Sequence, residues 1–165
     1  MKEKIVIEGG KKLFGSIPIA GAKNSCLALM PLSLLSDQTL ILNNVPLLSD
    51  VGTMKDLLES LGCEALYENL SKTIKIKLLR EGLFLADYDI VKKMRASILV
   101  LGPLLTRFGQ GVVALPGGCA IGARPVDLHL MALEALGARF SIDKGYIKGK
   151  VDGSLKGCKI TFPFV

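Results

Sequence analysis

Apolar and polar residues alternate along the chain with two periods, one typical of helices and one typical of strands. Two stretches, about 24–36 and 95–107, are apolar on nearly every side, which predicts buried helices. Apolar residues at helical spacing over about 50–61 and 125–136 predict amphipathic helices. Short apolar or alternating runs predict the strands, at about 38–44, 63–68, 73–79, 111–116, 138–143 and 146–151.

This pattern occurs twice, because the chain contains an internal repeat. Offsets of 72 and 75 residues superimpose identical residues, among them Ser25/Ser97, Pro31/Pro103, Leu58/Leu133 and Gly62/Gly137. Each copy, roughly 5–79 and 82–151, predicts a β-α-β-α-β-β unit, and a strand at 158–162 resembles the start of a third copy. The expected fold is therefore α/β (α+β), with helices inside and sheets outside, and we expect the chain to be truncated relative to it.

Local signals support the boundaries of these elements. Gly62 and Gly137 suit the left-handed position at which the amphipathic helices end. Ser49 and Pro125 are suitable starting residues for the same helices. The sequence Asp-Lys-Gly at 143–145 predicts a hairpin turn.

Composition narrows the classes of function. No apolar stretch reaches the ~20 residues that a membrane helix needs, and no signal peptide is recognisable, so we expect a cytoplasmic protein. The chain has 21 Lys and Arg against 15 Asp and Glu, a net charge of +6, which favours anionic partners. With no Trp and only short basic runs, we expect anionic metabolites rather than nucleic acid. Four cysteines without a Cys-x-x-Cys motif and a single histidine argue against a metal site.

The second copy of the repeat carries three extra residues in a glycine-rich segment, Pro-Gly-Gly-Cys-Ala-Ile-Gly-Ala-Arg-Pro-Val-Asp-Leu-His at 116–129. Its glycines make the backbone permissive, as a moving lid requires. Cys119 would lie at the tip, and both Arg124 and the following helix start would lower the pKa of its thiol. The alternative is a solvated connector with an incidental cysteine. The position in an insertion favours the lid.

Two cations begin the buried helices at equivalent positions of the repeat. Lys23 with Asn24 opens the first buried helix and Arg95 opens the second, which predicts a common rim that faces an anionic ligand. Taken alone, Lys23 could equally be a lysine at the end of a core helix. His129 and Met131 fit surface and core positions better than ligand positions.

These residues resemble the enolpyruvyl transferases, and the resemblance runs from residue 3 to the C-terminus. The segment around Cys119 resembles the branch that acts on UDP-N-acetylglucosamine, since the sibling branch that acts on shikimate 3-phosphate lacks this cysteine loop. The resemblance implies transfer of the enolpyruvyl group of phosphoenolpyruvate to the 3′-hydroxyl of UDP-N-acetylglucosamine, the first committed step of peptidoglycan synthesis. It implies an inverse αβ-barrel with two domains, and no metal or organic cofactor.

The resemblance also assigns roles to individual residues. Cys119 would donate a proton to the vinyl carbon and could form a covalent phosphoenolpyruvate adduct. Lys23, Asn24 and Arg124 would contact phosphoenolpyruvate. The nucleotide sugar would contact Arg95 and the run Arg124, Pro125, Val126, Asp127 and Leu128.

Several parts of the family pattern are missing. Residues 1–20 resemble a segment that packs with an absent second domain, and residues 21–165 resemble part of the first domain. The third unit and the second domain's Asp base and Arg clamp are absent, and Phe164 stands where some relatives have lysine. Two rival readings therefore remain: a non-catalytic fragment or gene remnant with weak nucleotide-sugar binding at most, and the shikimate branch. An uncovered apolar flank would also favour self-association.

Overall fold

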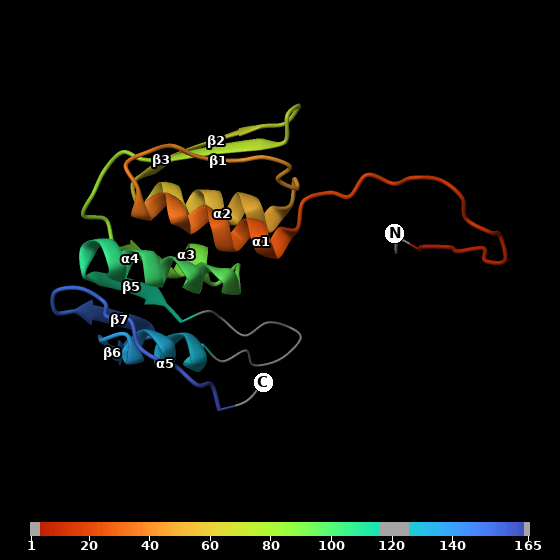
Figure 1. The fold of residues 1–165 in the computed structure, drawn as a ribbon. Coiled ribbons are helices and arrows are strands. Elements are labelled where there is room, and N and C mark those ends of the chain that lie inside the picture. The colour runs from red at the N-terminus through yellow and green to blue at the C-terminus, as the bar shows by residue number, and fades with distance from the viewer. Residues whose placement is uncertain (1–3, 116–125, 164–165) are drawn as a thin grey trace.

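The computed structural model describes residues 4–115 and 126–163 (Figure 1). The helices are α1 (Lys23–Leu29), α2 (Ser49–Ser60), α3 (Tyr88–Val91), α4 (Leu101–Phe108) and α5 (Asp127–Ala135), with 3-10 helices η1 (Met30–Leu35) and η2 (Arg95–Val100). The strands are β1 (Leu40–Leu42), β2 (Cys63–Glu68), β3 (Thr73–Leu78), β4 (Leu85–Ala86), β5 (Gln110–Ala114), β6 (Ala138–Asp143) and β7 (Tyr146–Val151).

The two copies of the repeat form two sheets of the same design. The first sheet has the order β1-β3-β2 and the second contains β5-β7-β6, with antiparallel pairing throughout these three strands. In the second sheet, β4 adds a parallel strand beside β5. The predicted turn at 143–145 joins β6 to β7 through Lys144 and Gly145, whose φ values of 48° and 81° fit a tight hairpin turn.

The helices lie on the inner side of the sheets. Figure 1 shows α1, α2 and α4 between the first sheet and β5 of the second. Met30, Leu34, Met54, Leu104 and Ile147 are fully buried there, in one apolar core that joins both units. The expected architecture of inward helices and outward sheets is confirmed.

Both predicted buried helices are present, but each is part α-helix and part 3-10 helix. In the first copy α1 passes into η1 at Met30, and in the second copy η2 passes into α4 at Leu101. Pro31 at the start of η1 has no N–H to donate to an α-helical bond, which accounts for the change there.

Two expected strands do not form among the described residues. Residues 4–20 run without helix or strand, leave Ile17 and Ile19 85% exposed, and extend away from the body of the molecule (Figure 1). Residues 158–162 are also without regular structure. A strand is stabilised by pairing with a neighbour, and no described strand pairs with either segment.

Two short elements had no predicted bounds. Strand β4 forms at the start of the second copy, where the β-α-β-α-β-β unit implies a strand, and α3 follows it. They have two and four residues, so neither is long enough to show a hydrophobic period. The start of α3 is capped by Asp87, whose side chain accepts a hydrogen bond from the backbone N–H of Asp89 at 2.9 Å. Among the described residues, no helix has the length and apolar character needed to cross a membrane.

Candidate substrate site

Lys23 is the first residue of α1, as the sequence predicted, and its charge already has a partner. Its ammonium Nζ lies 2.7 Å from Oδ2 of Asp50, an acidic residue in the first turn of α2. Both side chains are partly exposed, at 44% and 33%. An anion can therefore reach Lys23, but it must share the ammonium with Asp50 or displace that carboxylate.

The chain reaches Lys23 through a tight contact at Gly21. A side chain at this position would begin 1.7 Å from the backbone oxygen of Asn44, in the loop after β1. Only glycine lets the two backbone segments approach so closely. This contact fixes where α1 starts, and therefore where Lys23 and the exposed Asn24 lie.

A pocket of about 150 Å³ lies beside the same contact. Its walls include Ser25, Cys26 and Leu29 of α1 and the loop residues Asn43 and Asn44. Neither Lys23 nor Arg95 lines it. The pocket is therefore separate from the predicted anion-binding residues, whose side chains do not form its walls.

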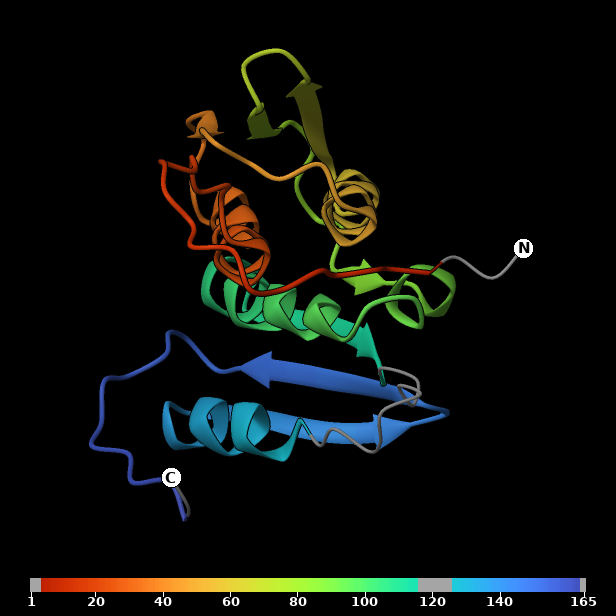
Figure 2. The same cartoon turned by 90° about the vertical axis from the view of Figure 1, so that its right-hand side faces the viewer.

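Arg95 is the first residue of η2 and is half-buried. It holds the position in the second unit that Lys23 holds in the first. Figure 1 shows the starts of α1, η2 and α5 at one end of the molecule, the end that faces the viewer in Figure 2. The structure therefore gathers both cations and the start of α5 on one side.

The start of α5 contributes the other described residues of the predicted nucleotide-sugar site. Val126 is buried with 5% of its surface exposed, Leu128 is 38% exposed, and Asp127 lies exposed in the first helical turn. Buried Val126 anchors the helix start, while its two neighbours face outward. Cys119, Arg124 and Pro125, together with Phe164 and Val165, lie outside the described residues.

His129, which the sequence pattern assigned to surface or core, lies next to this cluster. Its Nδ1 atom is buried and has no hydrogen-bond partner among the described residues. Burial, together with the nearby positive charge of Arg95, lowers the pKa of the imidazole, which favours the uncharged ring. A buried polar atom without a partner is costly in a folded protein, which makes His129 a candidate for a functional role.

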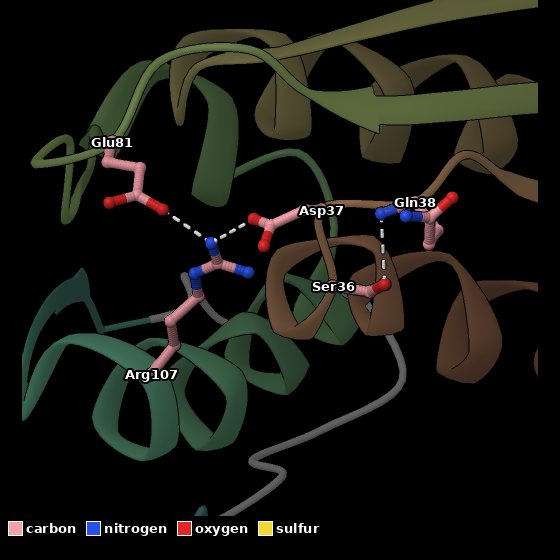
Figure 3. A network of polar contacts seen from close by, with 5 residues as sticks. All are labelled: Ser36, Asp37, Gln38, Glu81 and Arg107. Carbon is pink, nitrogen blue, oxygen red and sulfur yellow. Dashed lines mark hydrogen bonds and ion pairs between the residues drawn. The ribbon is translucent and has the colours of Figure 1, made fainter.

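A network of ion pairs between side chains joins the two units (Figure 3). Arg107 in the last turn of α4 forms ion pairs with Asp37, 2.5 Å away in the loop after η1, and with Glu81 in the segment between β3 and β4. The two carboxylates raise the pKa of the guanidinium above its usual value. The network connects the first unit to α4 of the second on the side away from the start of α1.

The described residues at this end of the molecule are of the kinds that can bind an anion. Lys23 and Arg95 carry positive charge, and Asn24 carries an amide. Within the described residues, no group of three or more His, Cys, Asp or Glu side chains is arranged to hold a metal ion.

Comparison with solved structures identifies the fold as that of the enolpyruvyl transferases. The enolpyruvyl transferase NikO from Streptomyces tendae superimposes with a TM-score of 0.74 at 18% sequence identity, over 92% of this chain and 33% of that one. EPSP synthase from Acinetobacter baumannii gives a TM-score of 0.66 at 15% identity, over 92% of this chain and 35% of that one. The family model for EPSP synthase (3-phosphoshikimate 1-carboxyvinyltransferase) matches residues 7–165, so the chain belongs to this family.

Closer relatives carry the name UDP-N-acetylglucosamine 1-carboxyvinyltransferase. The protein from Dinoroseobacter shibae is 58% identical over 163 residues, which are 99% of this chain and 39% of the relative. The protein from Jannaschia sp. is 54% identical over 98% of this chain and 38% of its own length. The chain thus spans about two-fifths of the length of these relatives.

Proposed function

We propose that the chain forms the N-terminal part of a UDP-N-acetylglucosamine 1-carboxyvinyltransferase. The reaction transfers the enolpyruvyl group of phosphoenolpyruvate to the 3′-hydroxyl of UDP-N-acetylglucosamine and releases phosphate. The observation that carries the proposal is the pair of cations, Lys23 and Arg95, that begin equivalent helices at one end of the molecule. Both substrates are anionic, and the names of the 54–58% identical relatives point to the same reaction.

Each cation has a separate task in this proposal. Lys23 and Asn24, together with Arg124, bind phosphoenolpyruvate, whose phosphate takes over the ammonium that Asp50 now holds. Arg95 and residues 124–128 bind the nucleotide sugar. A charge-assisted hydrogen bond contributes about 1.5–3 kcal/mol, enough for each contact to change affinity by tenfold or more.

Cys119 is the proposed proton donor. It protonates C3 of phosphoenolpyruvate while the 3′-hydroxyl oxygen bonds to C2, where positive charge develops as the double bond is lost. The hydroxyl proton would pass to the Asp base of the family's second domain. A proton then returns from C3 to the Cys119 thiolate as phosphate leaves C2, which restores the vinyl group on the product. The glycine-rich segment around Cys119 would close over the substrates and exclude water. No metal or organic cofactor takes part.

The proposal extends to the wider architecture. Residues 1–20 would pack with a second domain, and residues 21–165 would form part of the first domain, with 158–165 leading into a third unit. The reaction would be the first committed step of peptidoglycan synthesis, in the cytoplasm, and fosfomycin would be an inhibitor.

A second candidate function is non-catalytic binding of a nucleotide sugar. In this case the residues around Arg95 would bind UDP-N-acetylglucosamine weakly, and no transfer would follow.

Titration calorimetry of the 165-residue chain tests which acceptor it recognises. We expect saturable, weak binding of UDP-N-acetylglucosamine that Arg95→Gln lowers by roughly tenfold or more. Arg139→Gln, which removes an 83% exposed arginine from β6, is the matched control and should leave the affinity unchanged. Preference for shikimate 3-phosphate, or equal binding by the Arg95 variant, would contradict the assignment.

A further inference from the structure

The outer face of the second sheet carries a pair of like charges where the first sheet carries a pair of opposite charges. In the hairpin of β2 and β3, the register sets Glu64 opposite Lys77. At the equivalent positions of β6 and β7, the second residue of one strand and the last but one of the other, Arg139 lies opposite Lys150. All four residues are exposed. The repeat therefore forms the same hairpin with either kind of pair, so the fold itself does not require the two cations.

The two cations are not neutralised by their surroundings. Like charges directly opposite each other on neighbouring strands destabilise a sheet. Within the described part of the chain, the side chain of Lys150 has no ion-pair partner. Arg139 has Asp152, 3.1 Å away, and these side chains are 83% and 61% exposed, while Lys148 is paired with Asp143 at 2.6 Å. Exposed pairs of this kind contribute little stability, so the cations can take further anionic partners, and a local cost without a structural return is typical of a binding surface.

These cations point away from the inner helices, and they lie beside a free strand edge. A side chain at Gly149 would begin 3.0 Å from Leu105 of α4, so the Gly149 side of β7 packs on the helices. Lys148 and Lys150 flank Gly149 and therefore lie on the opposite face. Strand β6 pairs with β7 on one side and with no described strand on the other. The outer face thus combines positive charge with unpaired backbone groups along β6.

We propose that the β6–β7 surface, formed by Arg139, Lys148, Lys150 and the free edge of β6, binds an extended acidic segment of a partner protein. The segment adds as a further strand beside β6, where main-chain hydrogen bonds hold it. An acidic residue of the segment then lies directly opposite Arg139, which places one anion beside the two cations of the row. The surface shares no residue with the predicted substrate site, so this inference is independent of the proposed function.

The make-up of the surface favours a protein segment over other anionic partners. Basic clusters that bind membranes contain about four to eight Lys and Arg, more than this surface offers. Single-stranded nucleic acid binds through aromatic platforms as well as charge, and Tyr146, the aromatic residue in this register, lies opposite Asp143. Alternate residues of a strand lie about 7 Å apart on one face, so acids at alternate positions of a peptide match the spacing of Lys148 and Lys150.

Fluorescence anisotropy with a labelled eight-residue peptide that alternates Thr and Glu tests the proposal. The peptide is titrated with the 165-residue chain at low salt. We expect saturable binding that weakens as salt rises, and no saturable binding of the peptide that alternates Thr and Gln. Arg139→Gln combined with Lys150→Gln should lower the affinity at least about fivefold.

The first sheet supplies a matched control for this loss. Lys75→Gln combined with Lys77→Gln removes two lysines from the equivalent outer face and should change the affinity by less than about twofold. Equal losses in the two double variants would overturn the proposal, because net charge alone would then explain the binding.

A single substitution separates binding from folding. Lys150→Glu sets an acid opposite Arg139, as the first sheet sets Glu64 opposite Lys77. We expect this variant to melt no lower than the unmodified chain and to lose saturable binding of the Thr-Glu peptide. A lower melting temperature would show that the sheet itself requires Lys150, and retained binding would show that the peptide binds elsewhere; either result refutes the proposal.

Amide hydrogen exchange tests the place of binding. We expect exchange to slow along β6 when the Thr-Glu peptide is bound, because the added strand takes up its unpaired backbone groups. Unchanged exchange along β6 in the saturated complex would contradict the proposed strand addition.

Competition tests the class of partner. The bound peptide is challenged with vesicles of phosphatidylcholine and phosphatidylserine and with a single-stranded oligonucleotide, each at the same concentration of negative charge as an unlabelled Thr-Glu peptide. We expect the unlabelled peptide to compete best. Stronger competition by the vesicles or by the oligonucleotide would overturn the assignment to an acidic protein segment.

Discussion

Cys26 and Cys63 are buried in the core, and burial raises the pKa of both thiols. For Cys63 a hydrogen-bond contact with Ser33, 3.8 Å away, opposes this rise without reversing it. Cys158, in contrast, is exposed, and its Sγ lies 3.2 Å from the carbonyl oxygen of Ala135. The thiolate is the reactive form, so a raised pKa and burial both slow alkylation at a given pH.

We therefore expect iodoacetamide at pH 7.5 to label Cys158 well before Cys26 and Cys63 in the folded chain. Cys119, five residues before Arg124 in the sequence, should react fastest, because a nearby cation lowers a thiol pKa. Because their pKa values are raised, Cys26 and Cys63 should gain reactivity only as the pH rises above the range in which an ordinary thiol ionises. Peptide mapping by mass spectrometry at several times and pH values measures the order, and early labelling of Cys26 would contradict it.

At the scale of secondary structure, α1 starts where the close approach of Gly21 to Asn44 allows it. Gly21→Ala would place a methyl group 1.7 Å from the Asn44 oxygen, so one of the two backbone segments must move. Overpacking of this kind costs about 1–3 kcal/mol, and we expect thermal unfolding to show that loss. Gly52→Ala is the control: nothing lies within 4 Å of its added carbon, and alanine in α2 should stabilise by up to about 1 kcal/mol. Equal melting temperatures for the two variants would refute the steric argument.

The elements show what a sequence can and cannot predict. Strands β2, β6 and β7 have the predicted bounds, because local alternation and a turn such as 143–145 determine them. The expected strands near the N-terminus and at 158–162 depend on a partner strand, which local sequence does not contain. The repeat predicted that Lys23 and Arg95 begin equivalent helices, and they are the first residues of α1 and η2. Helical spacing alone could not decide between a surface and a core position for His129, and the structure leaves it half-buried on α5.

At the scale of the whole molecule, Arg107 ties the two units together through Asp37 and Glu81. Its side chain is only 18% exposed, whereas the acids are 81% and 62% exposed. We expect Arg107→Gln to lower the free energy of unfolding by about 1 kcal/mol, and less at high salt, since mobile ions screen exposed pairs. Lys148→Gln, which removes a pair within one hairpin, is the control and should change stability less in chemical denaturation. The same loss in both variants would mean that the network does not hold the units together.

Partly exposed leucines form an apolar stripe along α1 and η1. Leu29, Leu32 and Leu35 follow one face of α1 and η1 and are 41–43% exposed. We expect the 165-residue chain to self-associate through this stripe, and Leu29→Lys combined with Leu32→Lys to restore a monomer. Sedimentation velocity measures the effect. A wild-type chain that stays monomeric at 100 µM or above would contradict it.

The central claim is that this chain carries the family's substrate-binding residues in working form, and one rate measurement tests it most directly. A hybrid joins this chain to the C-terminal remainder of the Dinoroseobacter shibae relative, which it matches at 58% identity, and phosphate release from phosphoenolpyruvate is followed with UDP-N-acetylglucosamine as acceptor. We predict turnover by the hybrid that depends on UDP-N-acetylglucosamine, a loss of most of that turnover in Cys119→Ser, and no measurable turnover by the 165-residue chain alone. A correctly folded hybrid that releases no phosphate, or that uses shikimate 3-phosphate instead, would contradict the account.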